Sequence, residues 1–189
     1  MEGNEQLAVI IPMLKQVGAG IAAGQLNNPT PCALFSVSGV LEHMTGLASA
    51  YAPAFRGDTP TDTTSSHRAD TEPALDFDQA MDALLDAVQR PGALERTIDT
   101  PFGPMPGATF ARLVAFDGLI HGWDLATSTQ QPWNPPEEVV AEVDAFARQA
   151  IAPEMRDGNT FAQPINPPSD ATLLLRLVAF SGRKVATSI

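Results

Sequence analysis

Apolar residues recur every three or four positions through most of the chain, which is the spacing of an α-helix with one buried face. This pattern predicts helices over residues 5–24, 36–55, 76–90, 107–128, 135–155 and 169–182. Strict alternation of apolar and polar residues is scarce, and only the stretch 90–107 is expected to hold a short extended piece. The predicted fold class is therefore all-α, with a four-helix core and additional short helices.

Residues with known positional preferences set the expected helix ends. Ser36 is a good N-cap for the second helix, and Ser169 and Gly182 suit the start and the end of the last one. Pro106 suits the first turn of the fourth helix. Pro12 is expected to bend the first helix or delay its start, because proline has no backbone N–H to donate.

The composition fits one domain over residues 1–189, interrupted by a flexible polar surface loop at 56–75. Apolar residues make up 44% and charged residues 17%, which is typical of a globular protein. The net charge of −11 argues against nucleic acid as a partner, because phosphates require Lys and Arg. We expect a cytoplasmic protein with no membrane segment. The first residues lack a basic signal region, no apolar run is long enough to span a bilayer, and the single cysteine, Cys32, fits a reducing compartment.

The segment "FDGLIHGWDLA" (116–126) places a carboxylate and an imidazole among apolar residues. Asp117 and His121 are four positions apart, so they lie on one helical face, which Phe110 and Val114 continue. Both side chains are suitable ligands for zinc or a similar first-row ion. The alternative is that they pair with each other inside an ordinary helical core.

A third ligand would have to come from another helix, and His43 is the best candidate. It lies between Gly39 and Gly46 on one face of the second helix. Glycine inside a helix costs about 1 kcal/mol relative to alanine, so two of them suggest that space is needed there. Three protein ligands with one open position are typical of a catalytic metal. His67 lies in the polar loop and is excluded.

Four further residues each allow a functional and a structural interpretation. Asp124 could orient a metal ligand, or bond backbone at the helix end. Arg183 could contact an anionic substrate, or complement the negative end of the last helix. Trp123 could be a substrate platform, although a core position is favoured. Cys32 could approach the metal, although a small buried hydrophobe is favoured.

Four short motifs occur in the order "PTPC" (29–32), "LEHMTG" (41–46), "DGLIHGWDLA" (117–126) and "LLRLVAFSGR" (174–183). In this combination the chain resembles the mycothiol-dependent maleylpyruvate isomerase N-terminal family, one of the DinB-like metal-binding helical bundles. The resemblance implies a four-helix bundle with a divalent metal, usually zinc and sometimes nickel. By position, the implied ligands are His43, Asp117 and His121, with water completing the shell.

The family's known members use a low-molecular-weight thiol such as mycothiol. The resemblance therefore implies a metal-dependent thiol S-transferase or isomerase that acts on a small electrophile. The alternative is a non-catalytic metal- or small-molecule-binding protein, and a homodimer is possible in either case. The chain departs from the family pattern at Asp117, where the family often has Glu, and at Phe35, where Trp is often found.

Overall fold

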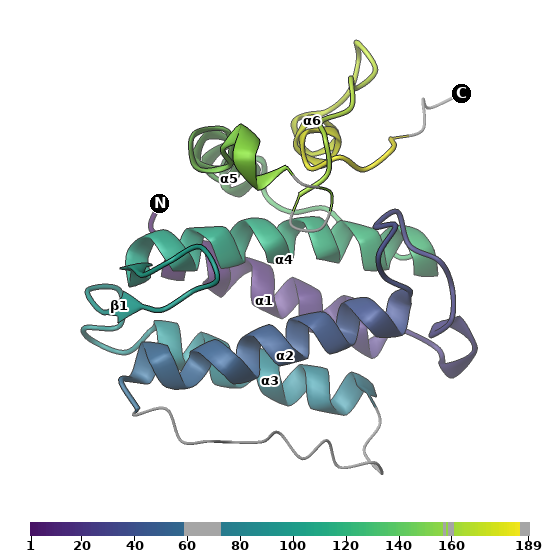
Figure 1. The fold of residues 1–189 in the computed structure, drawn as a ribbon. Coiled ribbons are helices and arrows are strands. Elements are labelled where there is room, and N and C mark those ends of the chain that lie inside the picture. Colours follow the sequence, from purple (N-terminus) through teal and green to yellow (C-terminus); the bar gives the residue numbers. More distant parts are fainter. Residues whose placement is uncertain (59–72, 157, 159–160, 186–189) are drawn as a thin grey trace.

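Four long helices lie side by side in the computed structural model, which describes residues 1–58, 73–156, 158 and 161–185 (Figure 1). They are α1 (Gly3–Ala19), α2 (Val37–Arg56), α3 (Pro73–Val88) and α4 (Gly107–Thr129). α1 packs against α3 and α4, and α2 packs against the same two helices. The mainly helical content confirms the all-α prediction.

Two shorter helices, α5 (Glu137–Ala150) and α6 (Leu173–Phe180), form a second layer on the opposite side of α4 (Figure 1). α5 packs against α4, and α6 packs against α5. α4 is therefore enclosed between two layers of helices. In the described part of the chain, no helix is long and apolar enough to cross a membrane.

This central position explains the sequence of α4, which is apolar on most of its surface rather than along one stripe. Side chains that point in different directions are all buried, among them Phe110, Leu119, Ile120 and Leu125. On the side facing α1, a Cβ at Gly118 would lie 3.3 Å from the side chains of Ile10 and Leu14, and its absence allows close approach. Polar side chains on α4 are consequently placed in the interior.

The extended piece expected between residues 90 and 107 is a two-stranded antiparallel ribbon of β1 (Thr97–Ile98) and β2 (Met105–Pro106). Thr97 pairs with Pro106 and Ile98 with Met105. Pro106 thus ends the ribbon and caps α4, whereas the sequence placed it within the first helical turn.

The first helix differs from its prediction at both ends. α1 begins at Gly3 and runs through Pro12, so the proline neither delays nor interrupts it. It ends at Ala19, where the N–H of Gly20 bonds to the carbonyls of Gln16 and Val17. A separate 3-10 turn, η1 (Ala23–Gln25), occupies the rest of the predicted range.

The remaining helix ends are partly as predicted. Ser36 caps α2, because its Oγ accepts the N–H of Gly39 at 3.2 Å. The third helix begins at Pro73, three residues before its predicted start, and most of the predicted 56–75 loop, including His67, lies outside the described residues.

The two C-terminal helices are shorter than predicted. α5 ends at Ala150, and the 3-10 turn η2 (Pro153–Met155) follows it. The N-cap of α6 is Thr172 rather than Ser169, with its Oγ1 accepting the N–H of Leu175 at 3.3 Å.

Candidate metal centre

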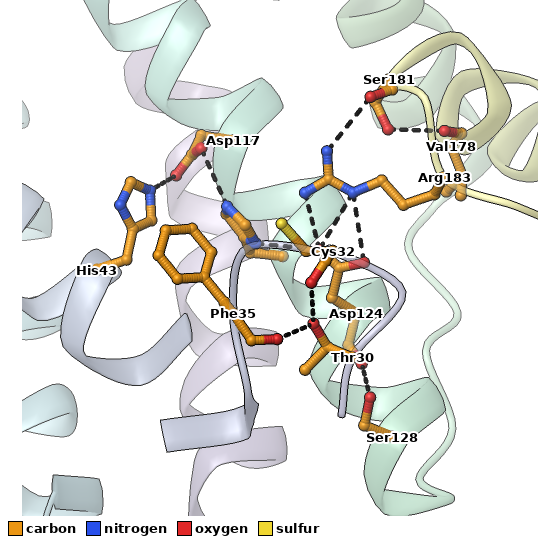
Figure 2. A network of polar contacts seen from close by, with 11 residues as sticks. Thr30, Cys32, Phe35, His43, Asp117, Asp124, Ser128, Val178, Ser181 and Arg183 are labelled. Carbon is orange, nitrogen blue, oxygen red and sulfur yellow. Dashed lines mark hydrogen bonds and ion pairs between the residues drawn. The ribbon is translucent and has the colours of Figure 1, made fainter. Parts of the chain in front are cut away.

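The three predicted ligands meet where α2 faces α4. His43 comes from α2, and Asp117 and His121 come from successive turns of α4. One ligand atom from each residue lies within 4.8 Å of the others. Figure 2 shows His43 and Asp117 pointing toward each other across the gap between the two helices. The structure therefore brings together all three residues that the sequence selected.

The distances within this cluster are longer than good hydrogen bonds. His43 Nε2 lies 3.4 Å from Asp117 Oδ2, and His121 Nε2 lies 3.5 Å from Asp117 Oδ1. His43 Nε2 is buried and has no hydrogen-bond partner among the described residues. A tetrahedral ion with bonds of about 2.1 Å holds its ligand atoms about 3.4 Å apart. The donor types and their spacing therefore fit a divalent metal.

The electrostatics favour an ionised carboxylate beside the two imidazoles. Burial by itself would raise the pKa of Asp117, but the positive charges of His121, His43 and Arg183 outweigh this effect and lower its pKa. In turn, the Asp117 carboxylate raises the pKa of His43, against the opposing effect of burial. Asp117 is therefore in the charge state that a metal ligand requires.

A buried series of polar contacts fixes the ring of the second histidine, His121. His121 Nδ1 lies 3.0 Å from Asp124 Oδ2, and the Asp124 side chain is completely buried. Arg183, which follows α6, donates from Nη2 to the same Oδ2 at 2.9 Å (Figure 2). An Nδ1–H bonded to a carboxylate leaves Nε2 free for a metal, an arrangement that recurs around metal-bound histidines.

Phe35 packs on the two histidine rings from the loop before α2. Its ring stacks on His43 with centroids 5.1 Å apart, and it meets His121 edge-on at 5.9 Å. The loop is held by Thr30, whose Oγ1 donates to the carbonyl of Phe35 at 2.7 Å. Gly39 leaves room for this ring, because a Cβ there would lie 3.3 Å from it.

A cavity of about 360 Å³ opens onto one side of the cluster, and we call it the Arg183 cavity. Its lining includes Cys32, Phe35, His121 and Arg183. Cys32 is half-buried and lines this space, so it is not the fully buried hydrophobe that the sequence favoured. Trp123 is half-buried and packs against the apolar core.

A second cavity, of about 450 Å³, opens onto the other side of the cluster between α2 and α4. Its lining includes Gly46, Tyr51, Phe110 and Val114, and we call it the apolar cavity. A Cβ at Gly46 would meet no atom within 4 Å, so this glycine borders open space. The space that the helical glycines beside His43 predicted is therefore present at Gly46, whereas the apolar lining from Tyr51 and Phe110 was not predicted.

The sequence profile of the mycothiol maleylpyruvate isomerase N-terminal domain family matches residues 11–126. The chain belongs to this family. It is also 31% identical over 176 residues to the uncharacterized proteins Rv0738 and MT0763 of two Mycobacterium tuberculosis strains. Each alignment covers 88% of this chain and 90% of the relative. No solved structure matches the chain.

The family match contains part of the site described above. His43, Asp117, His121 and Asp124 all lie within residues 11–126, whereas Arg183 lies beyond them. The family suggests a metal-binding role related to mycothiol, and the structure contains a candidate His/Asp/His site.

Proposed function

We propose that this chain is a metal-dependent enzyme that uses a low-molecular-weight thiol, of the mycothiol kind, to modify or isomerise a small electrophile. The observation that carries the proposal is the position of the His43–Asp117–His121 cluster between two cavities. Family membership supports the thiol. Three ligands leave one position of a tetrahedral ion open, as catalytic sites require.

In this proposal His43, Asp117 and His121 hold the ion, and helices α1 to α4 form a DinB-like four-helix bundle around it. The packing of α1 and of α2 on both α3 and α4 supports the bundle. Zinc suits two imidazoles and one carboxylate, and nickel is the second candidate. A cytoplasmic location and a homodimer stay predictions.

The chain's own residues position the reactants. A divalent metal, when bound, lowers the pKa of a thiol that occupies its open position. Asp124 fixes the ring of His121, and Phe35 fixes the ring of His43. In an S-transfer, the thiol gives up its proton to solvent, a C–S bond forms, and a leaving group departs with its electron pair. In an isomerisation the C–S bond forms and later breaks, which returns the thiol.

The test is cobalt substitution followed by thiol addition. We expect the Co²⁺-loaded protein to develop a sulfur-to-cobalt charge-transfer band in the near ultraviolet when mycothiol is added, and the His121→Ala variant to show none. Conjugation of the thiol to electrophiles is then followed by mass spectrometry. Cobalt binding with no thiol band would contradict the proposal and favour the alternative, a non-catalytic metal-binding protein.

A further inference from the structure

The apolar cavity differs in chemistry from the Arg183 cavity on the other side of the cluster. Apart from His43 and Asp117, the side chains that border it are apolar, with Tyr51 as the one hydroxyl among the described residues. Tyr51 packs on Phe110 with ring centroids 4.4 Å apart. Phe102, which is 49% exposed, stands among the lining residues. A volume of about 450 Å³ suits a small organic molecule.

The two cavities share two of the three candidate metal ligands. His43 and Asp117 border both of them, and so do Phe116 and Phe161, whose rings are 5.9 Å apart. A molecule in the apolar cavity would therefore lie against the same two ligands as a molecule in the Arg183 cavity. This arrangement allows two reactants to approach the site from different sides.

The charges around the apolar cavity argue against an anionic occupant. In the described part of the chain no Lys or Arg borders it. A carboxylate placed among the apolar side chains, away from the proposed metal position, would lose its hydration without gaining a cationic side chain as a partner. Burial raises the pKa of Tyr51, so its hydroxyl is a neutral donor at neutral pH. The mostly apolar lining therefore matches an uncharged, apolar group better than an anion.

We propose that the apolar cavity binds the electrophilic substrate, and that this substrate is an uncharged aromatic or aliphatic molecule rather than a carboxylic acid. The inference rests on the proposed function, because it assigns the thiol to the Arg183 cavity. It deepens that function by naming the substrate class.

The test compares two ligands of equal ring size, 2-naphthalenemethanol and 2-naphthalenesulfonate, in titrations of the zinc-loaded protein followed by naphthalene fluorescence. The sulfonate is a poor metal ligand, so the ion does not mask the effect of its charge. We expect the alcohol to bind about tenfold more tightly or better. Equal or tighter binding of the sulfonate would overturn the proposal.

Variants locate the binding. Gly46→Leu and Ala50→Leu each place a larger side chain in the cavity, and each is expected to weaken binding of the alcohol by about tenfold. Both positions are exposed on α2, and leucine favours helix, so the fold is expected to persist. Gly24→Leu is the matched control, because its Cβ also meets no atom within 4 Å and it borders neither cavity. Unchanged binding in both cavity variants would overturn the proposal.

Zinc content and the cobalt–thiol band separate the two possible failures. If both are present and the alcohol does not bind, the substrate assignment is wrong and the proposed function stands. If both are absent and the alcohol binds in a Gly46-dependent way, the cavity assignment stands and the thiol chemistry is wrong.

Discussion

At the scale of single residues, the carboxylate of Asp117 faces two imidazole nitrogens and bonds well to neither. In the metal-free protein, it stabilises the protonated form of His43 and is itself kept ionised. The His43 contribution to stability is complete below the unfolded pKa of that residue, near 6.5, and is lost as the pH rises through the raised folded pKa. The Asp117 contribution is present above an unfolded pKa near 3.8 and is lost as the pH falls through the lowered folded pKa.

Replacing the carboxylate therefore has a pH-dependent effect. In metal-free Asp117→Asn, the pKa of His43 is expected to fall, as measured by NMR titration of the ring. The free energy of unfolding, from urea titrations, is expected to differ most from the wild type between pH 3.8 and 6.5. Asp144→Asn, which removes the carboxylate paired with Arg148 on α5, is the control. An unchanged His43 pKa would contradict this account.

In the proposed metal site Asp124 is a positioning residue, since it contacts His121 and is not one of the three proposed ligands. Asp124→Asn is expected to weaken zinc binding by about 10- to 100-fold, as measured by chelator competition. Arg183→Met also breaks the ion pair but leaves the Asp124–His121 contact in place. It is the matched control and is expected to lose less zinc affinity. Equal losses in the two variants would show that Asp124 acts only through stability.

At the scale of elements, α4 is packed so closely that small residues are needed along it. A Cβ at Gly122 would lie 2.3 Å from the ring of Trp133, which is buried. We expect Gly122→Ala to destabilise the protein by about 1–3 kcal/mol through overpacking. Trp133→Leu in the same chain is expected to recover part of this loss. If the changes in the free energy of unfolding of the two single variants simply add in the double variant, as measured by urea titration, a direct clash between the two positions would be contradicted.

The helix pattern predicted most elements because each of α1 to α3 buries one face. The errors lie at the ends, where contacts distant in sequence decide the outcome. The backbone after α5 bonds to α6, as in Ile165 N–H to Ala179 O at 2.9 Å, and Arg156 Nη1 donates to the Phe180 carbonyl at 3.1 Å. Such bonds compete with continued helix, and local periodicity cannot report them.

At the scale of the whole molecule, the layer of α5 and α6 completes the site. It carries Arg183 to Asp124, a residue 59 positions earlier in the chain. Asp117 and His121 could be paired from the sequence because a helix places them together. The link between Asp124 and Arg183, and the extent of the cavity beside Gly46, depend on how separate helices pack. From the sequence, Asp124 and Arg183 each kept two interpretations, and the glycines indicated space near His43 without its size or lining.

This tertiary link predicts a stability effect. Arg183→Met leaves the buried Asp124 carboxylate without its cation, which is expected to cost about 3 kcal/mol in the free energy of unfolding. Urea titrations of the metal-free protein measure it. The double variant Arg183→Met with Asp124→Leu, which removes both charges, is expected to be more stable than Arg183→Met alone. A double variant of lower stability would contradict the unpaired-charge explanation.

The most direct test of the account is the metal content of untagged protein, measured by plasma mass spectrometry beside the His43→Ala, His121→Ala double variant. We expect about one zinc or nickel ion per wild-type chain and loss of that ion in the variant. Absence of stoichiometric metal from the wild type, even after incubation with Zn²⁺ and Ni²⁺, would contradict it, and Asp117 would then be a structural partner of the two histidines.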